Sequence, residues 1–370
     1  MQPVRLPRED STSRDPKSGV SVRQVTSAPA IHHHPFFFVP AYDRAERFLF
    51  FVSHRGGRPQ IMAEERATGD LLRFTDRDDI AEWSVHPSPD GGRVYFTAGS
   101  AAWMVDTATG DEERLADFGA AEMREKGMVG AAMGTTALSA SGDWWAVPVR
   151  TGARTRFHLI DTRKATSEVF LERDTIGHPQ FCPDDDDLIL YAGPLTDRVW
   201  VTDRSGAGNR RVHEREDPLQ WVTHETWIPG ERAIMFVDWA RGLRRIDLES
   251  GAVDWLSRFP AWHAITDASG RHVVCDTNFP DIGMHLIDLA SAPDAGADFL
   301  AWSHASSAGF HWAGPFPYND GPVAVYAPQH THAHPRFSPS GRHVVFTSDR
   351  DGHAQVYEIS LDPAAGADTP

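Results

Sequence analysis

The sequence predicts an all-β fold, a seven-bladed β-propeller whose ring is closed by an N-terminal strand that joins the last blade. Three observations predict it. A polar turn followed by an apolar strand recurs seven times within the 370 residues. Most copies lie roughly 40 to 50 residues apart, a spacing typical of propeller blades. A strand-like segment without neighbours of its own precedes the first copy. The regular repetition disfavours a β-sandwich or a β-helix.

Each copy begins with a tight turn. Pro, Asp, Ser and Gly favour hairpin turns, and the β-branched or aromatic residues that follow predict a buried central strand. A second strand ending in Asp follows most copies, and a further turn leads to an outer strand. The last interval is longer, and we expect residues 303–329 to form an extended loop rather than another blade. The seven turns lie near Asp43, Asp90, Gly142, Asp184, Gly230, Gly270 and Gly341.

The two ends of the chain predict how the ring closes. The last unit stops after three strands, whereas residues 20–27, VSVRQVTS, resemble an isolated outer strand. Docked beside the last unit, this strand would complete the seventh blade and cover an exposed edge. We therefore assign residues 20–362 to the propeller, residues 1–19 to a flexible N-terminal segment and residues 363–370 to a C-terminal tail.

Composition narrows the function classes. The formal net charge is −16, which makes nucleic acid and anionic membranes poor partners. The polar N-terminus lacks the apolar core of a secretory signal, and no run of about 18 apolar residues predicts a membrane span. The two cysteines show no paired spacing. These features predict a cytoplasmic protein, and an acidic substrate would need local positive charge from a metal or from Arg.

Histidine recurs shortly before the turns. The innermost strand of each propeller blade faces the central axis, so residues at this position converge near the mouth of the channel. One such histidine could simply hydrogen-bond in a polar channel. Several neutral imidazoles aimed at one axis favour a metal site instead. Aligned on the turns, the position holds His34, His178, His224, His263 and His334, with Ser84 and Thr135 in the other two units.

The segment QHTHAHP, residues 329–335, gives the strongest local signal. Alternate residues of a strand share a face, so His332 and His334 point the same way. With His263 they supply three nitrogens, and Gln329 could add an amide oxygen. This donor set suits Mn²⁺, Fe²⁺, Ni²⁺ or Zn²⁺ better than Ca²⁺ or Mg²⁺. No cysteine lies nearby, which argues against a structural zinc site.

These motifs resemble the oligogalacturonate lyase family, cytoplasmic propeller enzymes of pectin breakdown. The resemblance extends from about residue 20 to residue 361. It is carried by the Gln-x-x-His-x-His-Pro element at 329–335, the Pro-Ala-Trp-His element ending at His263, the Thr-His-Glu-x-Trp element around His224, the Arg-Val-Trp element beginning at Arg198, and the Gly-His-Pro element around His178.

The resemblance implies roles for these residues. His263, Gln329, His332 and His334 would bind Mn²⁺. His224 would be the base that starts a β-elimination, Arg198 would assist it, and Arg198, His178 and His34 would contact a small acidic oligosaccharide. Where the family often has His-Glu before Gly-Pro, this chain has Tyr191 and Ala192, and its third unit lacks an inserted loop near residues 151–157.

Three functions remain open from the sequence. The first is a metal-dependent lyase acting on short oligogalacturonates. The second is a non-catalytic TolB-like interaction propeller, whose turn-and-strand repeats are similar but which has no need of a converging His/Gln set. The third is a lyase or epimerase acting on a different acidic sugar with the same metal and base.

Overall fold

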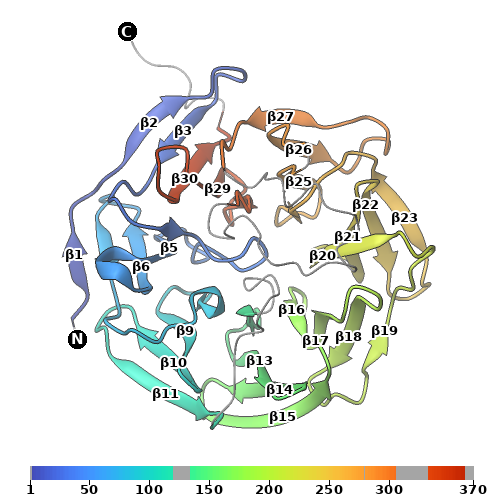
Figure 1. Cartoon of the computed structure of the whole chain (residues 1–370), viewed down its shortest axis with the longest axis horizontal. Coiled ribbons are helices and arrows are strands. Elements are labelled where there is room, and N and C mark those ends of the chain that lie inside the picture. The colour runs from blue at the N-terminus through green and yellow to red at the C-terminus, as the bar shows by residue number, and fades with distance from the viewer. Residues whose placement is uncertain (1, 120–133, 279, 306–331, 363–370) are drawn as a thin grey trace.

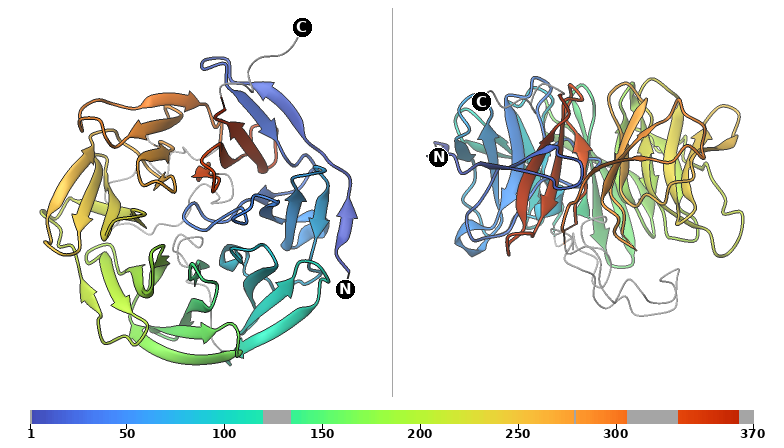
Figure 2. Two further views of the ribbon diagram at one scale, coloured as in Figure 1. Left: turned by 180° about the vertical axis from the view of Figure 1, so that it is seen from behind. Right: turned by 90° about the horizontal axis from the view of Figure 1, so that it is seen from above.

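Seven antiparallel sheets stand around a central axis in a computed structural model of the chain (Figure 1). The structure describes residues 2–119, 134–278, 280–305 and 332–362. The predicted seven-bladed propeller is therefore confirmed. Seen edge-on, the blades form a disc, and the N-terminal strands run along its outer rim (Figure 2). No helix in the described ranges is long and apolar enough to cross a membrane.

Each blade begins near the axis, and its strands pair in chain order toward the rim. Blade 1 contains β4 (His32–His33), β5 (Phe48–Ser53), β6 (Gln60–Glu65) and β7 (Leu71–Arg73). Blade 2 contains β8 (His86–Pro87), β9 (Arg93–Ala98), β10 (Ala101–Asp106) and β11 (Glu112–Asp117). Blade 3 contains β12 (Ala137–Leu138), β13 (Trp144–Thr151), β14 (Arg154–Asp161) and β15 (Thr166–Arg173). Blade 4 contains β16 (Gly177–Cys182), β17 (Asp185–Ala192), β18 (Val199–Asp203) and β19 (Arg210–Arg211).

The remaining blades repeat this order. Blade 5 contains β20 (Trp221–Trp227), β21 (Ala233–Trp239), β22 (Gly242–Asp247) and β23 (Val253–Ser257). Blade 6 contains β24 (Ala264–Thr266), β25 (His272–Cys275), β26 (Met284–Asp288) and β27 (Asp298–Ala301). Blade 7 contains β28 (Arg336–Phe337), β29 (His343–Ser348) and β30 (Gln355–Ser360). Two short 3-10 helices, η1 (Arg55–Gly57) and η2 (Glu82–Ser84), lie in blade 1 and before β8.

The core lies between neighbouring blades. Phe50 and Val52 of β5, for example, pack in one cluster with Val94 and Phe96 of β9, and all four are fully buried. The apolar strands that follow the seven turns therefore bury their faces against the next blade, as the repeat pattern predicts.

The ring closes as predicted, because β3 (Ser21–Gln24) pairs antiparallel with β30 and places Val22 opposite Ile359. Residues 1–19, predicted to be a flexible segment, contain two strands. Within it, β2 (Ser11–Arg14) pairs with β3, and β1 (Val4–Leu6) pairs with β7 of blade 1. β1 pairs with a strand far along the chain and β2 forms a hairpin with β3, and no local apolar pattern predicts either pairing. The proposed tail, residues 363–370, lies outside the described residues.

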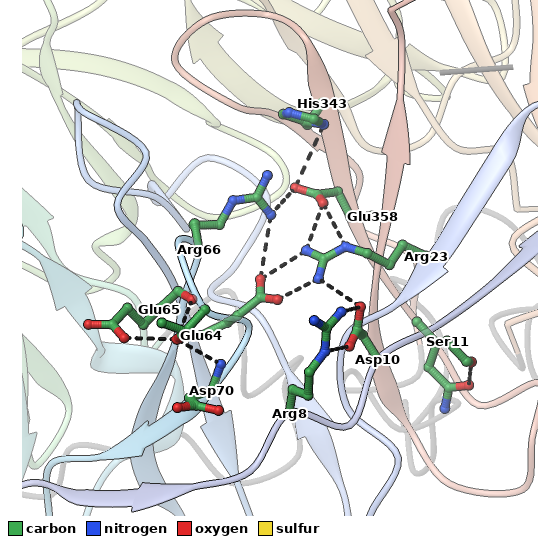
Figure 3. Close-up of polar contacts among 12 residues, drawn as sticks. Arg8, Asp10, Ser11, Arg23, Glu64, Glu65, Arg66, Asp70, His343 and Glu358 are labelled. Carbon is green, nitrogen blue, oxygen red and sulfur yellow. Dashed lines mark hydrogen bonds and ion pairs between the residues drawn. The ribbon is translucent and has the colours of Figure 1, made fainter. Parts of the chain in front are cut away.

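A network of ion pairs joins the first and last blades (Figure 3). Arg23 of β3 forms a bidentate pair with Glu64 of β6, and it also donates to Glu358 of β30 at 2.8 Å. Arg66 donates to the other oxygen of Glu358 at 2.6 Å. Only 2% of the Glu64 side chain and 5% of the Glu358 side chain is exposed. Two buried carboxylates thus depend on two guanidinium groups at the closure of the ring.

Replacing Arg23 with Met is expected to lower the free energy of unfolding by about 3–5 kcal/mol, because it leaves buried carboxylates without their main counter-charge. Urea unfolding followed by tryptophan fluorescence measures the change. Arg5→Met is the matched control, because half of the Arg5 side chain is exposed and its pairs with Glu65 and Asp70 lie at the surface. Equal unfolding midpoints for the two variants would contradict the expectation.

Candidate functional site

A cluster of three histidines lies at the central axis. His263 stands directly before β24, and His332 and His334 precede β28 of the next blade. One ring nitrogen from each lies within 4.8 Å of the others, and all three residues are buried. The structure therefore brings together three of the four predicted metal ligands. The fourth, Gln329, lies outside the described residues, as does most of the loop predicted over 303–329.

The backbone gives these inner positions a shared geometry. His178, His224 and His334 have φ values of 48°, 51° and 47°, a left-handed conformation that side chains other than glycine rarely adopt. The pairing register shifts at His178 in β16 and at His224 in β20, which marks β-bulges. Bulges and strained residues of this kind redirect side chains and gather at functional sites. Equivalent residues in three blades share the distortion, which agrees with the alignment on the turns.

Asp276, at the end of the inner hairpin of blade 6, fixes the cluster. His263 donates from Nδ1 to Oδ2 of Asp276 at 2.8 Å, and the backbone N–H of His263 donates to Oδ1 at 2.7 Å. The backbone N–H of His334 donates to Oδ2 at 3.3 Å. Burial raises the pKa of Asp276 to about 7, although the hydrogen bonds from the backbone N–H groups of His263 and His334 lower it. With Nδ1 of His263 occupied, its Nε2 carries the lone pair.

A divalent transition metal fits these donors. Nε2 of His334 is buried and has no hydrogen-bond partner among the described residues, which leaves a lone pair to be satisfied. Burial lowers the pKa of His263 and of His334 well below the ordinary value, so both rings are neutral, the form that binds metals. A carboxylate on the far nitrogen of a ligating imidazole, as with Asp276 and His263, is the usual support of such a site.

His224 lies beside the cluster. The centre of its ring is 4.4 Å from that of His263 and 6.0 Å from that of His178. Its Nδ1 donates to the carbonyl oxygen of Trp262, so Nε2 carries the lone pair of the neutral ring. Burial, with the nearby rings of His263 and His178, lowers the pKa of His224 well below its ordinary value. The ring is therefore an anchored, neutral proton acceptor.

Arg198 and His178 share one buried carboxylate, that of Glu225. Arg198 donates from Nε to Oε1 of Glu225, and Nδ1 of His178 lies 3.0 Å from Oε2. Burial alone would raise the pKa of Glu225, but the guanidinium of Arg198 and the hydrogen bond with His178 bring it to about 2. The carboxylate of Glu225 therefore pairs with Arg198 and His178, although Glu225 directly follows His224 in the chain.

His34 lies at the edge of the three-histidine cluster. The centre of its ring is 6.5 Å from that of His334, and its Nε2 donates to the carbonyl oxygen of Ala333 at 3.3 Å. His34 is thus anchored to the backbone beside the cluster, as His224 is.

An aromatic segment, residues 36–38, completes the surroundings. It runs from blade 1 into the middle of the ring, where the blue trace is visible in Figure 1. The ring of Phe36 is centred 4.8 Å from that of His334, Phe37 lies 5.2 Å from His263, and Phe38 lies 5.4 Å from His178. Sequence reasoning missed this segment and Asp276, although three consecutive Phe residues after His34 are a visible signal. These rings exclude water from one side of the cluster.

Known proteins share this arrangement of blades. An oligogalacturonate lyase of Dickeya dadantii (strain 3937) is 24% identical over 382 residues, which cover 94% of each chain. An oligogalacturonide lyase of Pectobacterium atrosepticum is also 24% identical, over 95% of this chain and 96% of that protein. The chain is a distant homologue of the oligogalacturonate lyases. No family model matches the sequence.

A solved oligogalacturonate lyase in complex with manganese has the same fold as the present chain. The two superpose with a TM-score of 0.82 at 20% sequence identity, over 99% of this chain and 100% of the other. The sequence resemblance to this family is therefore confirmed by comparisons over nearly the full length.

Proposed function

We propose that this chain is a metal-dependent lyase that cleaves short oligogalacturonates by β-elimination, with a histidine as the base. One observation carries the proposal. Three buried histidines that fit a divalent metal lie next to a neutral, anchored fourth histidine, at the centre of a chain homologous to oligogalacturonate lyases along 94% of its length.

The reaction removes the proton on C5 of a uronate, next to its carboxylate, while the oxygen linked to C4 leaves. A divalent cation, when bound, would neutralise the carboxylate and so stabilise the negative charge that develops on it. His263, His332 and His334 would hold that cation, with Gln329 as the proposed fourth ligand. Manganese is the metal named for the solved relative, and the nitrogen-rich donor set is compatible with it.

His224 is the proposed base. A base must be unprotonated at the working pH, and burial keeps the pKa of His224 low enough for that. The hydrogen bond from Nδ1 to the carbonyl of Trp262 fixes the tautomer, so that Nε2 takes the proton. The neighbouring ring of His263 puts this nitrogen close to where a carboxylate held by the cluster would lie.

Arg198 is the proposed clamp for the substrate. Its guanidinium stays charged at any ordinary pH and matches a carboxylate in geometry. Glu225 holds its Nε, which aims the rest of the group while balancing part of its charge. His178 and His34 are proposed as further contacts to the sugar, on either side of the three-histidine cluster.

Digalacturonate and trigalacturonate, incubated with the metal-stripped chain plus Mn²⁺ or plus chelator, test the proposal. With Mn²⁺, each should yield an unsaturated uronate detected by its ultraviolet absorbance, and chelator should abolish the signal. Oligomers of mannuronate and guluronate are assayed in parallel, and NMR detects any epimers that form. Product from those oligomers alone would show that the substrate is another acidic sugar. No product from any oligomer would refute the lyase.

A further inference from the structure

A second cluster of metal-ligating side chains lies between blades 1 and 2. It contains His33 of β4, His54 directly after β5, and Glu82 at the start of η2. One ring nitrogen of each histidine and a carboxylate oxygen of Glu82 all lie within 4.8 Å of one another. The three come from separate stretches of the chain, and none has a role in the site described above.

Hydrogen bonds orient these groups toward a common point. Nδ1 of His33 donates to the carbonyl oxygen of His34 at 3.0 Å, which leaves the lone pair of the neutral ring on Nε2. Nε2 of His33 and Nε2 of His54 lie 3.6 Å and 2.6 Å from the same oxygen of Glu82. Two imidazole nitrogens thus converge on one carboxylate oxygen.

The second observation concerns Nε2 of His33. Only 1% of its side chain is exposed, and its Nε2 has no hydrogen-bond partner among the described residues. A buried ring nitrogen left in this state is destabilising, and a cation bound to that nitrogen would remove the penalty. The side chains of His54 and Glu82 are each 23% exposed, so the cluster is reachable from solvent.

The repeats show that these residue types are not needed by the fold. His54 follows the strand β5 in the sequence Ser-His-Arg, and the equivalent turn after β29 reads Ser-Asp-Arg, with Asp349 in the same place. Glu82 lies two residues before Ser84, as the ligand candidate His332 lies two residues before His334. Blade 2 therefore offers a carboxylate at the position that carries a central histidine in blade 7.

We propose that His33, His54 and Glu82 form a second site for a divalent transition metal. Two imidazoles and one carboxylate with room for water match Zn²⁺ sites that have three protein ligands and a water as the fourth, and Fe²⁺ takes the same set of side chains. The ring of Trp83 packs 4.2 Å from His33 and 6.1 Å from His334. The second metal would tie the turn after β5 to η2 and hold Trp83 beside the central cluster.

Zinc binding by the full chain tests the site independently of any lyase activity. The starting protein is the double variant His332→Ala plus His334→Ala, which lacks two of the central ligands. After metal removal it is titrated with Zn²⁺, and with Co²⁺ for its visible absorption. One equivalent should bind. Adding Glu82→Gln or His54→Gln should remove that equivalent, whereas His272→Ala, which alters an exposed histidine paired with Asp267, should not.

The outcomes separate cleanly. No zinc bound to the double variant would overturn the proposal, and so would an equivalent that survives both Glu82→Gln and His54→Gln. Circular dichroism and the unfolding temperature report whether each variant is folded, and the two substitutions at partly exposed positions give independent answers if one of them destabilises the chain. A rise in the unfolding temperature on adding Zn²⁺, lost in the same two variants, is expected as a second readout.

Discussion

Replacing His332 and His334 together with Ala is expected to remove one equivalent of bound manganese and to reduce lyase turnover to background. The substitution takes away two of the three nitrogens that lie within 4.8 Å of one another and leaves only His263. A single imidazole cannot hold a divalent cation against water and dilution. Without it, the substrate carboxylate keeps its full charge, and removal of the C5 proton becomes far less favourable.

Metal analysis after dialysis and a turnover assay with added Mn²⁺ measure the effect. His272→Ala serves as control, because half of that side chain is exposed at the start of β25. Both residues of the double variant are buried, so its unfolding temperature is compared with that of the unmodified chain. A double variant that loses no manganese relative to the unmodified chain would show that the three-histidine cluster is not the metal site.

Replacing His224 with Ala is expected to lower kcat by about 10²–10⁴-fold while the manganese content stays unchanged. The reason is geometric. His224 is anchored through Nδ1 to the carbonyl of Trp262, so its Nε2 is free to take a proton, and its ring lies beside His263 without belonging to the three-histidine cluster. Losing this ring removes a proton acceptor but no ligand.

The measurement combines kcat at saturating digalacturonate with metal analysis of the same sample. Partial recovery of turnover with added imidazole would support a role as base, since a small molecule can fill the space left by the ring. Full turnover in the variant would exclude His224 as the base. Loss of manganese together with turnover would assign it to the metal instead.

Local patterns predicted much of this molecule. Turn residues and the β-branched or aromatic runs after them predicted seven units, because hairpins and buried strands depend on neighbours in sequence. The position seven residues before Gly270 and Gly341 predicted that His263 and His334 would meet, since equivalent positions of a propeller face one axis. A missing outer strand in the last unit predicted the closure by β3.

Contacts between distant segments decided the rest. Asp276 supports His263, Glu225 turns to His178 and Arg198, and residues 36–38 pack against the central rings, all through bulges and loop paths without a sequence period. The strand β1 pairs with β7, which lies far along the chain, and β2 pairs with β3. Neither β1 nor β2 has an apolar pattern that would predict the pairing. The repeat, the ring and the converging histidines are predictable from the amino-acid sequence, because they follow from short-range periodicity. The pairing of each carboxylate with its imidazole is visible only in the folded chain, because it depends on side-chain directions set across blades.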